Sequence, residues 1–196
     1  MRIFQDLQDQ ALLSMITEGK VGILPTDTVY GLVCRADNEE AVTRLYSLKH
    51  REHKPGTVIA ADSEQLVALG LQARYLKSFD RYWPGSVSAI IPTRGSEYLR
   101  QGVDGLAVRI PADPKITEFL RKVGPLLTTS ANMPGEQTAT NLEQARAYFG
   151  DQVDFYVDGG DMGGRPASTV IRIVDDTIEV LREGAVIIDE TGRVIA

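Results

Sequence analysis

The stretch Leu126-Leu-Thr-Thr-Ser-Ala-Asn-Met-Pro-Gly135 begins as an apolar run and changes abruptly to hydroxyl and amide side chains. A folding core does not need these polar groups, so the stretch predicts a buried strand that carries them to a site. The segment Val21-Gly-Ile-Leu-Pro-Thr-Asp-Thr-Val-Tyr-Gly31 shows the same order of apolar and then polar residues. In open α/β sheets, ligands bind beyond the carboxyl ends of strands, where backbone donors become free. The two segments therefore predict an α/β fold whose site is built from strand ends.

Two basic residues, Lys49 and Arg51, follow the apolar stripe Val42, Leu45 and Leu48 of an expected helix. The partial negative charge at the C-terminal end of a helix favours cations there. Together with the hydroxyls of the strand ends, this pair predicts a pocket that binds an anion. Two alternatives stay open: the hydroxyls form turns and helix caps, and the basic pair is a solvated helix end.

Apolar runs and helical patterns alternate along the chain and predict a twisted, open, mixed sheet flanked by helices. The expected strands cover residues 21–24, 57–61, 87–91, 105–110 and 126–128, and the expected helices cover residues 4–15, 37–48, 63–69, 113–124 and 141–149. Strands near residues 155, 170, 180 and 187 follow without long helices, so the tail is expected to add antiparallel pairs. The glycine-rich segment 158–165 is interpreted as a loop within one domain.

Length and composition indicate a single globular domain over residues 1–196. The chain is 43% apolar and 24% charged, which is typical of soluble proteins and unlike disordered or membrane proteins. No apolar run reaches the roughly 18 residues that span a bilayer. The N-terminal residues lack the pattern of a secretory signal, so we expect a cytoplasmic protein with no membrane partner.

Cysteine content and charge exclude two kinds of site. Cys34 is the only cysteine, which excludes an internal disulfide and a cysteine-based zinc cluster. The net charge of -6 argues against broad nucleic-acid binding, so any contact with tRNA or double-stranded RNA should be local and weak. The chain also lacks the glycine signatures of phosphate loops and of dinucleotide-binding folds.

Seven short motifs occur in order along the chain: Pro25-Thr-Asp-Thr-Val-Tyr-Gly31, Lys49-x-Arg51, Trp83-Pro-Gly85, Ala107-Val-Arg-Ile-Pro111, Thr129-Ser-Ala-Asn132, Ser168-Thr-Val170 and Leu181-Arg-x-Gly184. In this order they resemble the YrdC/TsaC family, and the resemblance runs from about residue 8 to residue 187. It implies the YrdC-like open sheet. It also implies synthesis of threonylcarbamoyl-AMP and pyrophosphate from L-threonine, bicarbonate and ATP. Separate transfer proteins would then use the product for threonylcarbamoyl-adenosine modification of tRNA.

The implied reaction, which makes the protein a nucleotidyltransferase, needs alignment and positive charge instead of a protein nucleophile. The carbamate oxygen attacks the α-phosphorus of ATP, so donors must lie where negative charge builds up. By resemblance, Lys49 and Arg51 neutralise the ATP phosphates and hold the carbamate as the catalytic residues. Mg²⁺ is expected to arrive with ATP and to be held mostly by its phosphates, because the sequence offers no protein metal cage.

The resemblance also assigns binding residues for the two larger substrates. ATP is expected to contact Lys49, Arg51, Ser130, Ala131, Asn132, Thr138 and Arg182, and L-threonine is expected to contact Thr28, Arg109, Thr129 and Ser168. Arg109 lies in an apolar strand, where a charge is costly unless it is paired. The threonine carboxylate would pair it; the alternative is a structural ion pair with one of the 27 acidic residues.

Two departures from the family pattern leave alternatives open. Relatives commonly continue with proline directly after the K-x-R motif, whereas in this chain residues 52–54 separate Arg51 from Pro55. Ala60 stands where many relatives carry a threonine-contacting histidine, so a paralogue with a different carbamoyl acceptor stays an alternative. A second alternative is a non-catalytic RNA-binding module on the same fold. The retained basic and hydroxyl motifs favour the enzyme, because an RNA binder needs no threonine pocket.

Overall fold

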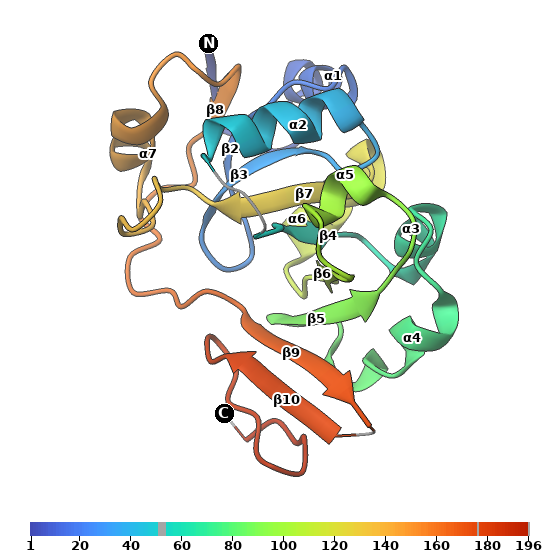
Figure 1. The fold of residues 1–196 in the computed structure, drawn as a ribbon. Helices are drawn as coiled ribbons and strands as arrows, with labels where there is room; N and C mark the ends of the chain where they lie inside the picture. Colours follow the sequence, from blue (N-terminus) through green and yellow to red (C-terminus); the bar gives the residue numbers. More distant parts are fainter. Residues whose placement is uncertain (51–53, 176, 196) are drawn as a thin grey trace.

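The computed structural model describes residues 1–50, 54–175 and 177–195. Within these residues, ten strands form one mixed sheet in the order β1-β8-β2-β3-β7-β4-β6-β5-β9-β10 (Figure 1). The strands are β1 (Arg2–Phe4), β2 (Gly22–Pro25), β3 (Tyr30–Arg35), β4 (Thr57–Ile59), β5 (Val87–Pro92), β6 (Gly105–Arg109), β7 (Leu126–Ser130), β8 (Phe155–Val157), β9 (Thr169–Val174) and β10 (Thr177–Arg182). The prediction of an α/β fold with an open mixed sheet and flanking helices is confirmed.

Strand direction changes repeatedly across the sheet. The neighbours β2, β3, β7 and β4 are successively antiparallel. β4 is then parallel to β6, β6 is antiparallel to β5, and β5 is parallel to β9. As a result β6 and β7 run in opposite directions, so their carboxyl ends lie at opposite edges of the sheet.

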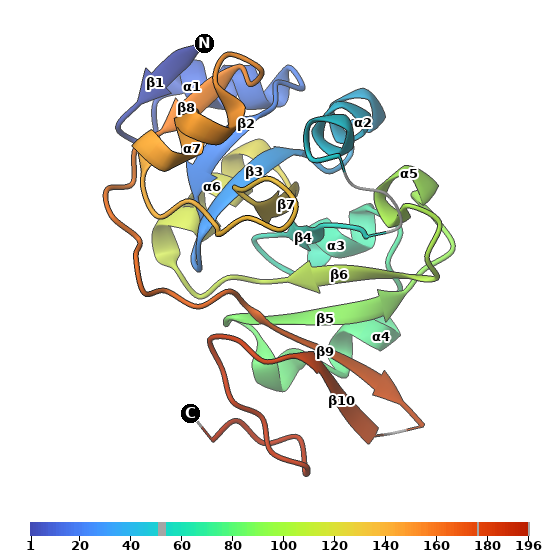
Figure 2. The same cartoon turned by 60° about the vertical axis from the view of Figure 1, so that its left-hand side comes forward.

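Helices cover both faces of the sheet (Figures 1 and 2). They are α1 (Gln10–Thr17), α2 (Glu39–Leu48), α3 (Ser63–Ala68), α4 (Ala73–Lys77), the short 3₁₀ helix η1 (Asp80–Tyr82), α5 (Glu97–Arg100), α6 (Pro114–Val123) and α7 (Leu142–Phe149). The strand β3 contributes to two separate core clusters, because successive side chains of a strand point to opposite faces. Leu32 and Cys34 join the cluster that includes α2 and α7, whereas Val33 joins the cluster that includes α1 and α6.

Side-chain caps explain where several helices begin. Asp113 Oδ1 accepts hydrogen bonds from the backbone N–H groups of Lys115 and Ile116, and Asn141 Oδ1 accepts one from Gln144. Asn38 caps α2 and Asp62 caps α3. The Asp37 carboxylate, one residue before the cap of α2, pairs with Arg35.

Several boundaries differ from the prediction. The expected helix over residues 4–15 overlaps the edge strand β1 at Phe4, and the helix itself begins after the cap Asp9. The strand β3, which the sequence pattern did not predict, is the partner of β2 in a hairpin. Of the strands described in the tail, β9 and β10 pair in antiparallel fashion, whereas β8 lies parallel to both β1 and β2. Near residue 187 there is an isolated bridge between Ile188 and Val194, not a strand.

Candidate functional site

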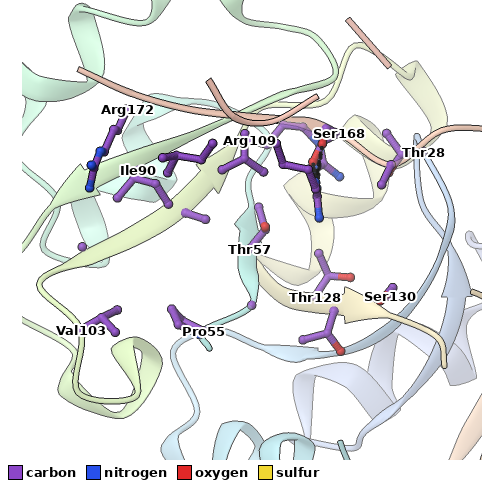
Figure 3. Close-up of a pocket in the computed structure, with 18 of the residues that line it drawn as sticks. Thr28, Pro55, Thr57, Ile90, Val103, Arg109, Thr128, Ser130, Ser168 and Arg172 are labelled. Carbon is purple, nitrogen blue, oxygen red and sulfur yellow. Dashed lines mark hydrogen bonds between the residues drawn. The ribbon is translucent and has the colours of Figure 1, made fainter. Parts of the chain in front are cut away.

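A cavity of about 770 Å³ opens beside the central strands (Figure 3). Thr28, Ser168 and Ser130 lie toward one end of it, and Val103 and Arg172 lie toward the other. Six residues that the sequence predicted as site residues line this cavity: Thr28, Arg109, Thr129, Ser130, Ser168 and Arg182. They come from the β2–β3 turn, from β6, β7 and β10, and from the residue directly before β9, so the fold gathers segments that are far apart in the sequence.

The turn between β2 and β3 is closed by threonine hydroxyls. Thr26 Oγ1 donates to the carbonyl of Val29 at 2.7 Å and lies 3.3 Å from Thr28 Oγ1. Immediately afterwards, Gly31 passes close to β7, because a Cβ placed there would lie only 2.4 Å from Thr128 Oγ1. Glycine at this position therefore allows the turn to approach the threonines of β7.

The guanidinium of Arg109 makes three hydrogen bonds to protein groups. Its Nε donates to Asp27 Oδ2 at 3.1 Å and its Nη2 donates to Asp27 Oδ1 at 2.8 Å, while Nη1 donates to Ser88 Oγ at 3.0 Å. The structural ion pair that was left open as an alternative is therefore present. A guanidinium carries five N–H donors, so one donor on Nη1 and one on Nη2 remain beyond these contacts.

Ser168 connects the Arg109 side of the cavity to β10. Its Oγ lies 2.9 Å from Ser88 Oγ, and Arg182 donates to the Ser168 carbonyl from Nε at 3.2 Å and from Nη2 at 2.7 Å. The Nη2 group also lies 3.2 Å from Ser168 Oγ. Asp27, Arg109, Ser88, Ser168 and Arg182 thus form one continuous hydrogen-bonded row along the cavity wall.

Thr129 is buried with its hydroxyl unpaired. It lines the cavity, and Oγ1 has no hydrogen-bond partner among the residues that the structure describes. An unpaired buried hydroxyl costs about 1–3 kcal/mol, so Thr129 Oγ1 lowers stability unless a group outside the described residues becomes its partner.

Lys49 lies beneath the turn that follows β7 and does not line the cavity. Its side chain is 4% exposed, and Nζ donates to the Ser130 carbonyl at 2.6 Å and to both the carbonyl and Oδ1 of Asn132. Ser130 Oγ also donates to Asn132 Oδ1 at 2.7 Å. The helix-end position of Lys49 is confirmed, but the ammonium is buried against a loop and is not a solvated helix end.

Three other expected ATP residues, Ala131, Asn132 and Thr138, continue from this turn and do not line the cavity. Ala131 is fully buried, and its N–H donates to the Tyr30 carbonyl at 2.8 Å. Ala139 donates back to the Ala131 carbonyl at 2.9 Å, which brings the neighbouring, half-buried Thr138 to the same loop. Arg51 lies outside the described residues.

The glycine-rich segment 158–165 is anchored at both ends. Gly159 N–H donates to the Tyr30 hydroxyl at 2.7 Å, and this hydroxyl donates to the Gly160 carbonyl at 3.0 Å. Burial raises the pKa of Tyr30, so the phenol stays protonated and able to donate. Further along, Met162 N–H donates to the Thr140 carbonyl at 2.7 Å. Tyr30 is therefore a core residue that fixes the approach to Ser168.

Two residues that bond to the cavity wall from behind were not predicted as site residues. Asp27 lies within the quoted motif of residues 25–31 but was not assigned a role, although an acidic residue between two threonines was a visible signal. Ser88 gave no signal, because it is a single hydroxyl inside an apolar strand and its partners come from other strands.

A family model for the Sua5, YciO and YrdC proteins, described as "Telomere recombination", matches residues 14–184. The chain belongs to the Sua5/YciO/YrdC family. The resemblance inferred from the ordered motifs is therefore confirmed, and it extends over most of the chain.

Relatives in this family are named as synthases. A threonylcarbamoyl-AMP synthase of Idiomarina loihiensis is 36% identical over 178 residues, which cover 85% of this chain and 94% of that protein. A putative threonylcarbamoyl-AMP synthase of Methanocaldococcus jannaschii is 32% identical over 180 residues, which cover 91% of this chain and 86% of that protein.

Solved structures of the Sua5/YciO/YrdC family share the fold. P. abyssi Sua5 in complex with L-threonine matches with a TM-score of 0.82 and 27% identity over 95% of this chain. The match spans 58% of that Sua5 chain. E. coli YciO matches with a TM-score of 0.77 and 26% identity over 94% of both chains. Among the described residues, no helix is long and apolar enough to cross a membrane.

Proposed function

We propose that this chain is a threonylcarbamoyl-AMP synthase, a nucleotidyltransferase that condenses L-threonine, bicarbonate and ATP with release of pyrophosphate. The observation that carries the proposal is the cavity itself, which Arg109, Ser168 and Thr129 line together with Ser130 at the end of β7. The synthase names of relatives that match most of the chain support the same reaction.

L-Threonine would occupy the end of the cavity formed by Thr28, Arg109, Thr129 and Ser168 (Figure 3). The two N–H groups of Arg109 that remain beyond its bonds to Asp27 and Ser88 are enough to bind both oxygens of a carboxylate. The Thr129 hydroxyl would gain its missing partner from the same ligand. The complex of P. abyssi Sua5 with L-threonine supports an amino-acid subsite in this fold.

ATP would lie against residues 130–132, with Thr138 and Arg182 beside it and Lys49 and Arg51 supplying positive charge. Lys49 Nζ donates to three oxygens of this turn. The ammonium therefore places a positive charge beneath the turn and also fixes the shape of the turn. Positive charge and fixed donors stabilise the negative charge that develops at the α-phosphorus. We assign Arg51 to the phosphates from its spacing to Lys49 alone.

Mg²⁺ would enter with ATP. The described residues contain no group of three or more His, Cys, Asp or Glu side chains that could hold a metal, so the phosphates would supply most of its ligands. When bound, the ion neutralises phosphate charge.

We also propose that residues 1–196 act as one catalytic domain and that the protein works in the cytoplasm. Separate transfer proteins would receive the product for tRNA modification. A direct contact with tRNA or double-stranded RNA would be weak.

Pyrophosphate release from ATP tests the proposal directly. It is measured with the purified protein, with both co-substrates, and with L-threonine or bicarbonate omitted, while mass spectrometry identifies the nucleotide product. The expected result is release that requires both co-substrates and forms threonylcarbamoyl-AMP. ATP turnover that is indifferent to threonine would contradict the synthase.

The same assay decides between the proposal and its alternatives. Ala60 is fully buried, and its backbone N–H donates to the Arg109 carbonyl at 3.1 Å. Because its side chain is a methyl group, it offers no polar contact to a carbamoyl acceptor. Replacing threonine by other amino acids tests for a different carbamoyl acceptor. A protein that releases no pyrophosphate but binds tRNA tightly would be the RNA-binding module instead.

A further inference from the structure

Ser88 is a fully buried serine on β5 that joins two residues of the cavity wall. Its Oγ accepts a hydrogen bond from Arg109 Nη1 at 3.0 Å and lies 2.9 Å from Ser168 Oγ. Arg109 and Ser168 line the cavity, whereas Ser88 lies behind them. A hydroxyl in an otherwise apolar strand costs free energy unless its hydrogen bonds are made, so its contacts account for its presence.

The surrounding groups restrict how the two serine hydroxyls can donate. Each hydroxyl has one proton. Arg109 donates to Ser88 Oγ, and Arg182 Nη2 lies in donor position 3.2 Å from Ser168 Oγ. Guanidinium groups offer no acceptor. Within the described part of the chain, each hydroxyl therefore has only the other one as an acceptor, and one of the two protons stays unpaired.

Burial decides which proton stays unpaired. Ser88 is enclosed on all sides and cannot direct a proton to a ligand, whereas Ser168 lines the cavity. If Ser168 donated to Ser88, the buried Ser88 proton would have no acceptor. The arrangement in which Ser88 donates to Ser168 therefore has the lower free energy. The Ser168 proton is then free for an acceptor in the cavity.

We propose that Ser88 is a positioning residue for the anion site: it holds Arg109 and makes the Ser168 hydroxyl a donor to an oxygen of the bound ligand. This inference rests on the proposed function, in which that oxygen belongs to the carboxylate of threonine or to the carbamate formed from it. Two guanidinium groups and a donating hydroxyl select an anionic acceptor and disfavour a cationic group at this position.

Removal of the Ser88 hydroxyl should weaken threonine binding. In Ser88→Ala, Arg109 loses its third contact and Ser168 loses the donor that fixes its proton. Hydrogen bonds to charged groups are among the stronger ones, so we expect the Kd for L-threonine to rise at least about tenfold, with the KM for ATP changing much less. Ser88→Thr keeps the hydroxyl and should restore most of the affinity. Thr93→Val is the matched control, because it removes a hydroxyl one residue beyond the same strand, outside the cavity wall.

A double-mutant cycle separates positioning from a general structural role. If Ser88 acts through Ser168, the two losses should be less than additive, because in the Ser168→Ala background Ser88→Ala removes only the contact with Arg109. Independent, additive losses, or wild-type threonine affinity in Ser88→Ala, would overturn the inference. Ser88→Cys, which preserves the volume but bonds weakly, provides the same comparison if Ser88→Ala does not fold.

Threonine affinity is measured by calorimetry on proteins whose thermal melts have been recorded, so it does not depend on turnover. A wild-type protein that binds threonine yet releases no pyrophosphate contradicts the proposed function and leaves this inference standing. Normal turnover combined with unchanged affinity in Ser88→Ala contradicts this inference alone. A wild-type protein that binds neither threonine nor bicarbonate contradicts both.

Discussion

Arg109 and Asp27 form a buried ion pair with two hydrogen bonds, from Nε to Oδ2 at 3.1 Å and from Nη2 to Oδ1 at 2.8 Å. The two side chains are only 3% and 5% exposed. One comes from β6 and the other from the turn between β2 and β3, so the pair holds this turn against the far side of the cavity. Breaking a buried pair by removing one partner leaves an uncompensated charge, which makes both residues informative targets.

Asp27→Asn should destabilise the ligand-free protein, because it leaves the Arg109 cation without its counter-charge. The expected loss is about 3–5 kcal/mol, visible as a lower Tm. If the threonine carboxylate binds Arg109, added L-threonine should raise the Tm of the variant more than that of the wild type. Thermal melts with and without threonine measure both effects. A variant that no longer responds to threonine would show that Asp27 is needed to present Arg109 to the ligand.

Arg109→Lys should lower the Tm and also raise the KM for threonine. Lysine keeps the charge but loses the planar fork that binds Asp27, so the ion pair weakens. It also loses the remaining N–H donors that the proposed carboxylate would use. Threonine titrations at saturating ATP test the second effect. Arg35→Lys is the matched control, since Arg35 forms its ion pair with Asp37. A lower Tm with unchanged KM would restrict Arg109 to its structural role.

Thr129→Val should weaken threonine binding without lowering stability. The hydroxyl has no partner among the described residues, so replacement by a methyl group removes no protein hydrogen bond and relieves an unpaired polar group. We expect an unchanged or higher Tm together with a threonine KM raised several-fold. A clear fall in Tm with normal KM would show that the hydroxyl contributes to folding and not to ligand binding.

Lys49→Met should reduce both turnover and stability. The ammonium holds oxygens of Ser130 and Asn132 close together, and its removal takes a charged donor from each of these partly buried acceptors. Turnover should fall at least about tenfold, because the turn that would contact ATP loses its shape and its charge. Arg51→Ala should lower turnover by a similar factor. Pyrophosphate release and thermal melts measure both variants, and near-normal turnover in both would remove these residues from the reaction.

Asp154→Asn should lower stability in a pH-dependent way. Burial tends to raise the pKa of Asp154, but hydrogen bonds from Arg44 and from the Val21 N–H outweigh it and hold the pKa below its ordinary value. A carboxylate whose pKa is lowered by folding stabilises the fold above its unfolded pKa, and this stabilisation is lost as the pH falls through the folded pKa. The Tm difference between variant and wild type should therefore be present at pH 7, begin to fall near the unfolded pKa of about 4 and disappear as the pH falls through the lower folded pKa. A difference that persists in acid would exclude the charge as its cause.

The sequence alone identified the fold class, the family and six residues of the cavity wall. Strand-end patterns placed Thr28, Thr129 and Ser130 correctly, because a change from apolar to polar residues marks where a buried strand leaves the core. The ordered motifs added Arg109, Ser168 and Arg182, which line the same cavity. Boundaries were less certain: β1 and β3 were not assigned, because short strands and helical spacing overlap in apolar segments.

Only the tertiary structure decided which of these groups are partners. Arg109 ends β6 and Ser130 ends β7, and these strands run in opposite directions, so a rule based on one edge of a sheet could not bring them together. The sequence likewise left open whether Arg109 is paired by a ligand or by the protein, and it gave no sign of Ser88. Local patterns report burial and chain direction, whereas an ion pair between residues 27 and 109, or a bond between residues 88 and 168, depends on how distant strands are ordered in the sheet.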